Sequence, residues 1–119
     1  MNAPLFQLNN IKDQDGLLTG TAIINVNHPI FNGHFPGNKV LPGACQLNLI
    51  SEIIKFHFPK VYRMTQAKSL KFTLLVNPFM INQFDFEIKY SIEGDSLLLN
   101  GKFVKEGTII FKYFLNYTS

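Results

Sequence analysis

The fold is decided by one stretch of sequence, Gly33-His34-Phe35-Pro36-Gly37-Asn38-Lys39-Val40-Leu41-Pro42-Gly43, which leads directly into a helical segment at residues 44 to about 58. The glycines and prolines of this stretch exclude a helix or an inner strand and predict an ordered loop. The first N–H groups of the following helix have no internal partner and form the positive end of its dipole. One imidazole ahead of a helix start therefore predicts a site that stabilises a developing negative charge.

Length and composition favour one domain that spans residues 1–119. The chain is 46% hydrophobic and carries a formal charge of +3 from 11 basic and 8 acidic side chains. The basic residues are scattered along the sequence, which argues against nucleic acid as the main ligand but allows an acidic protein partner. The single Cys45 excludes an intrachain disulfide, and no cysteine cluster indicates zinc. No segment resembles a signal peptide or a membrane span, so we expect a cytoplasmic protein.

The hydrophobic pattern predicts an α+β domain. Alternation and turn signals predict strands at residues 6–11, 17–26, 64–76, 81–92, 96–105 and 108–117, with a hairpin turn at Asp15-Gly16. Apolar residues recur at three- and four-residue steps on more than one side of the helix, so we expect a helix buried on several sides. A hairpin, a helix and a four-strand meander predict one antiparallel sheet of about six strands wrapped around that helix.

These motifs resemble the 3-hydroxyacyl-[acyl carrier protein] dehydratases of the hot-dog fold. The likeness is most specific from Gly33 to Glu52, where His34-Phe35-Pro36-Gly37 and Val40-Leu41-Pro42-Gly43 stand at the family's separation. The preceding residues 28–33 resemble the usual approach to that motif, and residues 72–78 resemble the family's third strand with its proline-containing end. The resemblance implies a hot-dog fold, no metal or redox cofactor, an acyl carrier protein thioester as substrate, and a homodimer or higher homo-oligomer.

The resemblance also assigns roles around the loop. His34 would be the general base that removes a proton from C2 of the acyl thioester, and an imidazole suits this role because its ordinary pKa is about 6.5. The Val40 carbonyl would hold the other ring nitrogen, and the Gly43 N–H would bond the thioester oxygen. Phe35 and Pro42, in the same matched segments, would line the substrate.

The family pattern breaks on the helix. Relatives carry a carboxylate fourteen residues after the histidine and a glutamine four residues later, whereas this chain has Asn48 and then Glu52. Positions four apart share one helix face, and a glutamate reaches toward the helix N-terminus. We therefore hypothesise that Glu52 is the general acid and that Asn48 positions it or binds the substrate hydroxyl.

The remaining titratable and apolar side chains have simpler interpretations. His28 and His57 are expected to be structural or exposed, and Cys45 is expected to be a small core residue. Lys39 and Arg63 either meet an acidic carrier helix or are ordinary surface charges. Core and dimer packing, with a share in an acyl tunnel left open, is expected for Phe72, Phe79, Phe84, Phe86, Phe103, Phe111 and Phe114.

The leading function is dehydration of 3-hydroxyacyl thioesters to trans-2-enoyl thioesters, in fatty acid or related polyene or polyketide-like biosynthesis. One alternative is a hot-dog acyl thioesterase, in which the Asn48 amide would hold a water. Another is a catalytically weak subunit that pairs with an active dehydratase, because the acid position is altered.

Overall fold

The computed structural model describes residues 4–32 and 39–119. The first hairpin consists of β1 (Phe6–Gln14) and β2 (Leu17–Ile24), followed by the short 3-10 helix η1 (Pro29–Asn32). The long helix α1 (Gly43–His57) leads to β3 (Arg63–Phe72), and β4 (Gln83–Glu93), β5 (Ser96–Lys105) and β6 (Thr108–Thr118) complete the chain. Asp15 and Gly16 both have positive φ, at 52° and 79°, as the predicted hairpin turn requires.

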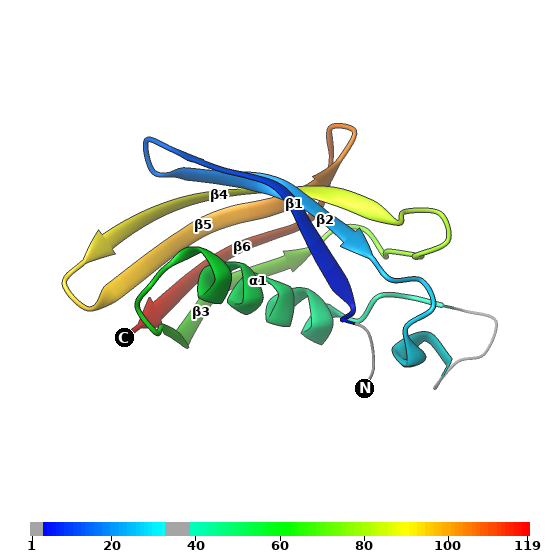
Figure 1. Cartoon of the computed structure of the whole chain (residues 1–119), viewed down its shortest axis with the longest axis horizontal. Coiled ribbons are helices and arrows are strands. Elements are labelled where there is room, and N and C mark those ends of the chain that lie inside the picture. Colours follow the sequence, from blue (N-terminus) through cyan, green and yellow to red (C-terminus); the bar gives the residue numbers. More distant parts are fainter. Residues whose placement is uncertain (1–3, 33–38) are drawn as a thin grey trace.

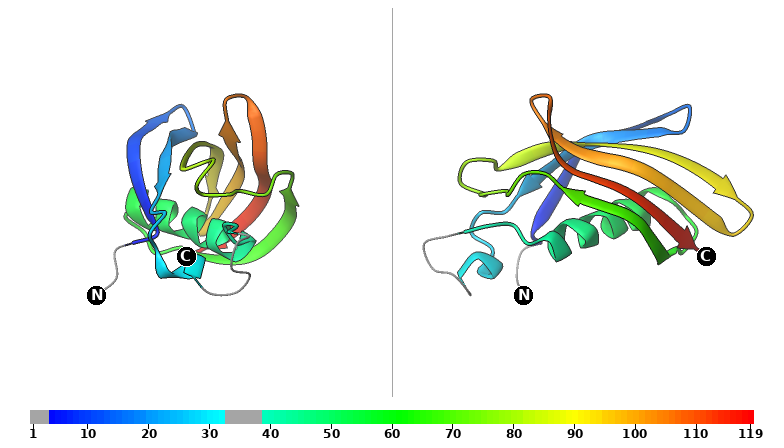
Figure 2. Two further views of the ribbon diagram at one scale, coloured as in Figure 1. Left: turned by 90° about the vertical axis from the view of Figure 1, so that its right-hand side faces the viewer. Right: turned by 180° about the vertical axis from the view of Figure 1, so that it is seen from behind.

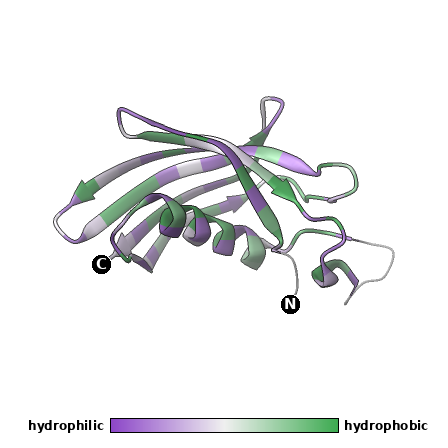
Figure 3. Ribbon diagram, in the orientation of Figure 1, coloured by the Kyte–Doolittle hydropathy of each residue, from purple (hydrophilic) through white to green (hydrophobic). Residues whose placement is uncertain are grey.

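The strands form one antiparallel sheet in the order β1-β2-β4-β5-β6-β3. This sheet curves around α1, which lies along its concave face (Figures 1 and 2). The predicted α+β class and hot-dog fold are confirmed. Hydrophobic and hydrophilic bands alternate along the strands, as the period of two dictates (Figure 3).

The predicted four-strand meander is wrong. Strands β4, β5 and β6 do follow one another, but β3 pairs with β6 at the far edge and β4 pairs with β2. Residues 73–82 link β3 to β4, and this link is longer than the two to five residues typical of a hairpin loop. The link therefore carries the chain back across the sheet to β2.

The expectation of a helix buried on several sides is also wrong. Only one face of α1 packs on the sheet, through Leu49, Ile50, Ile53 and Ile54 together with Gln46. On the opposite side Phe56 is 70% exposed. A single curved sheet covers only one face of a helix, so the rest of α1 stays open in one copy of the chain.

Aromatic rings fill the concave side of the sheet beneath the helix. Phe84, Phe86, Phe103 and Phe111 are fully buried, which confirms them as core residues. The Phe72 ring at the end of β3 stacks on Phe111 with 4.0 Å between centroids but is 45% exposed. Phe79 and Phe114 are also exposed, so the expected packing of all seven phenylalanines holds for part of the set.

Candidate active site

The start of α1 is built by the Leu41-Pro42-Gly43 segment. Pro42 precedes the helix in extended conformation, and its carbonyl accepts hydrogen bonds from the N–H groups of Cys45 (3.0 Å) and Gln46 (3.2 Å). The helix therefore begins at Gly43, whose N–H lies before the first intrahelical bonds. Backbone N–H groups and the helix dipole favour a negatively charged oxygen at this point.

Gly43 is required by a close approach from β3. A Cβ atom at this position would lie 2.9 Å from Cζ of Phe72, which is closer than real Cβ contacts come. The helix start is held in place on its other side as well, because the Leu41 N–H donates to the Val76 carbonyl at 2.8 Å. Absence of a side chain leaves the Gly43 backbone close to an aromatic ring.

Asn48 and Glu52 lie on the open face of α1. Both are exposed, while their neighbours Leu49 and Ile53 are fully buried against the sheet. Residues four apart are displaced by about 6 Å along a helix, so the two side chains occupy one stripe that starts near Gly43. A second structural element facing this stripe would meet an amide and a carboxylate together.

One further hydrogen bond ties this face of the helix to the sheet. Ser51 and Tyr117 of β6 join their hydroxyl groups at 2.8 Å. Burial raises the pKa of Tyr117, and the bond to Ser51 opposes that rise. The Tyr117 hydroxyl therefore stays neutral and links α1 to β6 through Ser51.

Several predicted site residues are placed, and others are not. Val40 is half-buried, and Pro42 and Gly43 stand at the helix start, with Asn48 and Glu52 farther along the same helix. His34 and Phe35 lie outside the described residues. The structure therefore places the helix start, Asn48 and Glu52 on one element, and the catalytic and binding roles of all these residues stay predictions.

The simpler expectations for Cys45 and His28 agree with the structure, and those for Lys39 and Arg63 stay open. Cys45 is half-buried beside the core, and burial raises the pKa of its thiol, which disfavours the nucleophilic thiolate. His28 is structural, because its Nδ1 accepts the Ile30 N–H at 3.1 Å. The Lys39 ammonium lies 5.3 Å from the centroid of Phe79, and Arg63 is exposed at the start of β3.

A second polar cluster, at the far end of the helix, was not predicted. Asp13 of β1 accepts hydrogen bonds from Tyr90 of β4 (2.5 Å) and joins Nε2 of His57 at 2.7 Å. The bond from Tyr90, and then that from His57, lowers the pKa of Asp13, while the bond to Asp13 raises the pKa of Tyr90 to about 12. The three residues are far apart in the sequence, so no local spacing signals the cluster.

A curved antiparallel sheet that holds one helix, with a polar helix face left open beside the helix start, defines a hot-dog protein. A family model described as ApeI dehydratase matches residues 10–107. The chain therefore belongs to the ApeI-like dehydratase family.

Curated relatives point the same way. The chain is 31% identical over 99 residues to the 3-hydroxyacyl-[acyl-carrier-protein] dehydratase FabZ of Thiobacillus denitrificans, covering 81% of this chain and 63% of that enzyme. It is 31% identical over 120 residues to the FabZ of Brucella melitensis biotype 2, covering 92% of this chain and 67% of that enzyme. The chain thus spans about two thirds of the length of these relatives.

Solved structures share the fold. The dehydratase heterocomplex ApeI:P from Xenorhabdus doucetiae matches with a TM-score of 0.76 at 13% identity, over 96% of this chain and 98% of that one. A hypothetical thioesterase with coenzyme A from Streptococcus pneumoniae matches with a TM-score of 0.66 at 13% identity, over 96% and 85%. Such identities show the fold alone, and function must be argued from the site. Among the described residues, no helix combines the length and the hydrophobicity needed to cross a membrane.

Proposed function

We propose that this protein dehydrates 3-hydroxyacyl thioesters carried on acyl carrier protein to trans-2-enoyl thioesters. The observation that carries the proposal is the helix start at Gly43, which follows the His34-Phe35-Pro36-Gly37 motif in the sequence and opens a helix with Asn48 and Glu52 on its free face. Its relatives named FabZ and ApeI are dehydratases. Fatty acid, polyene or polyketide-like biosynthesis, with no cofactor, is the expected setting, and the cytoplasmic location stays a prediction.

In the proposed reaction His34 removes the proton from C2 of the substrate. The electron pair of that C–H bond forms the C2–C3 double bond, and the C3–O bond breaks. Negative charge that develops on the thioester oxygen meets the Gly43 N–H and the positive end of α1. The Val40 carbonyl accepts the other ring N–H of His34 and fixes the tautomer that can take the proton.

Glu52 supplies the second proton. Its carboxylic acid protonates the departing hydroxyl, which leaves as water, and the Asn48 amide orients the carboxyl or the hydroxyl. Glu52 is exposed and shares its helix face with Asn48, so a substrate that enters from this side reaches both. Proton transfer from the imidazolium back to the carboxylate restores the starting state.

These roles are tested by the turnover of a 3-hydroxyacyl carrier-protein thioester, measured as formation of the enoyl thioester. Glu52→Gln is expected to lose roughly 10²- to 10⁴-fold in kcat, the range of one general acid. The matched control is Glu93→Gln, an exposed carboxylate at the end of β4. Near wild-type water loss by Glu52→Gln would contradict the assignment, and release of free thiol without enoyl product would favour the thioesterase.

We also infer that two copies pair along β3. All ten residues of this edge strand are exposed, and an unpaired edge is a template for another strand. On the concave side β3 presents Met64, Leu70 and Phe72, in register with buried residues of β6. Pairing of two copies would cover this apolar stripe together with the open face of α1.

A catalytically weak subunit that needs an active relative is the second candidate. The amide at Asn48, where relatives carry an acid, favours it, and the related ApeI:P structure is a heterocomplex. A purified chain that is inactive alone but raises the turnover of an added relative would support this candidate over the homodimeric enzyme.

A further inference from the structure

The outer, convex face of the sheet gathers basic side chains that are scattered in the sequence. Strand register places Lys102 of β5 opposite Lys112 of β6, and Lys112 opposite Lys71 of β3. Lys89 of β4 and Lys68 of β3 lie beside this row. Lys89 is paired with Asn100, two residues before Lys102, and Lys68 lies over the ring of Phe114, two residues after Lys112. These five lysines, of 11 basic residues in the chain, define what we call the outer lysine face.

Acidic neighbours balance the charges of this face only in part. The ion pairs between described residues join His57 to Asp13 and Lys60 to Asp95, so neither involves the outer lysine face. The register places one acidic residue, Glu87, beside Lys102 in that row. Like charges directly opposite one another on a sheet are destabilising. Three lysines in one row therefore cost stability in the free protein, and an anionic partner would remove that cost.

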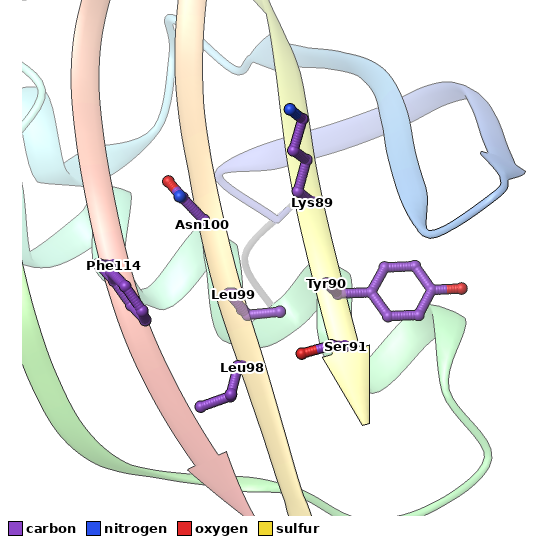
Figure 4. Close-up of a pocket in the computed structure, with 7 residues that line it drawn as sticks. All are labelled: Lys89, Tyr90, Ser91, Leu98, Leu99, Asn100 and Phe114. Carbon is purple, nitrogen blue, oxygen red and sulfur yellow. The ribbon is translucent and has the colours of Figure 1, made fainter. Parts of the chain in front are cut away.

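The centre of the face is apolar. Phe114 is 36% exposed and, with Leu98 and Leu99, lines a shallow hollow of about 230 Å³ (Figure 4). Lys89 and Asn100 border this hollow and also an adjoining one of about 330 Å³, where Lys102 and Lys112 outnumber the single carboxylate of Glu87. An apolar centre with a cationic rim is complementary to an amphipathic helix that presents one apolar side chain among acidic ones.

Protein suits this face better than nucleic acid. Single-stranded nucleic acid binds sheets by stacking bases on free aromatic faces. Here the Lys68 ammonium lies 5.1 Å from the centroid of Phe114 and covers one face of the ring. Leu98 adds an aliphatic side chain to the hollow, and Tyr90, which also lines it, is held by its hydrogen bond to Asp13.

One member of the outer lysine face, Lys71, lies at the end of β3 that supports the candidate active site. Lys71 points outward from β3, and the next residue, Phe72, points inward to the start of α1 at Gly43. Only the end of β3 therefore separates a protein bound at Lys71 from the proposed thioester site.

We propose that the outer lysine face docks an acidic amphipathic helix of the protein that carries the thioester substrate. The inference rests on the proposed dehydratase function. Attraction between the two charged surfaces increases the rate of encounter and tightens binding of the carried substrate. It has no effect on a thioester that lacks the carrier.

The test is the variant Lys102→Glu/Lys112→Glu, assayed with a 3-hydroxyacyl thioester of acyl carrier protein and with the same acyl group on a short thiol. We expect KM for the carrier substrate to rise about tenfold at low salt and less at high salt, with kcat unchanged. Turnover of the short thioester should stay at the wild-type value. The control Lys55→Glu/Lys60→Glu makes the same charge change at exposed positions that lie off the sheet.

Binding of holo acyl carrier protein, titrated without turnover, separates this proposal from the dehydratase proposal. Binding of the carrier by wild type but not by the variant would support the docking face, even if neither protein dehydrates a substrate. An unchanged affinity in the variant, an equal loss in the control, or no binding by wild type would overturn it. Binding of a labelled single-stranded RNA by wild type alone would assign the face to nucleic acid and overturn it equally.

Discussion

Gly101→Ala is expected to destabilise the fold through one buried contact. Gly101 lies on the inner side of β5, and an added Cβ would lie 2.6 Å from Cε2 and 2.8 Å from Cζ of Tyr113. The ring cannot move away, because Tyr113 is 1% exposed and packs on Phe103 and Phe111 with centroids at 5.4 and 5.1 Å. Overpacking of this kind costs about 1–3 kcal/mol.

The lower entropy of alanine in the unfolded chain offsets about 0.5–1 kcal/mol of that cost. The net loss in the free energy of unfolding is therefore centred near 1 kcal/mol, within a range of about 0–2.5 kcal/mol. For a domain of this size it corresponds to a fall in Tm of roughly 4 °C for each kcal/mol. Urea unfolding and a thermal melt followed by circular dichroism measure both quantities.

A second background makes the cause testable. Tyr113→Leu removes the aromatic atoms that the new Cβ would meet, so Gly101→Ala should cost at least about 1 kcal/mol less in Tyr113→Leu than in wild type. An equal cost of Gly101→Ala in both backgrounds would refute the steric argument. The cost would then arise from the backbone of β5.

Two shorter predictions follow from polar and apolar contacts. Tyr90 and His57 lower the pKa of Asp13 on folding, so its stabilising effect is present above the ordinary value of 3.8 and is lost as the pH falls through the folded pKa. Asp13→Asn should therefore be less stable than wild type at neutral pH, and this difference in the free energy of unfolding should disappear in acid. Urea unfolding at several pH values measures the difference, with Asp15→Asn as control. Leu70→Lys should shift the protein from dimer to monomer and lower turnover together, measured by light scattering and by enoyl formation; a dimer of undiminished mass would contradict pairing along β3.

The helix and the strands follow from local patterns, whereas the place of β3 does not. The periods of three to four and of two residues predicted α1 and all six strands, and the turn at Asp15-Gly16 has the expected positive φ. Pairing of β3 with β6 depends on residues 39 to 55 positions apart, from Phe72 with Phe111 to Arg63 with Thr118. No turn signal encodes such a pairing, so the prediction placed β3 beside β4.

The candidate site divides in the same way. The helical period alone places Asn48 and Glu52 on one face, and the structure adds that this face is open because the sheet covers only the other one. The outer lysine face was not predicted from the sequence, because its members are spread over residues 68–112 and come together only through strand register. The cluster of Asp13, His57 and Tyr90 was not predicted for the same reason, because these residues are far apart in the sequence.

The edge strand β3 connects the three proposals. Its inward residue Phe72 supports the start of α1, its concave apolar stripe is offered to a second copy, and its outward Lys71 belongs to the outer lysine face. In one copy β3 has a single neighbouring strand, so a second copy would fix its position from the other side. Pairing would therefore order the helix start and the docking face together. For this reason, loss of the dimer is expected to lower turnover as well as the mass of the particle in solution.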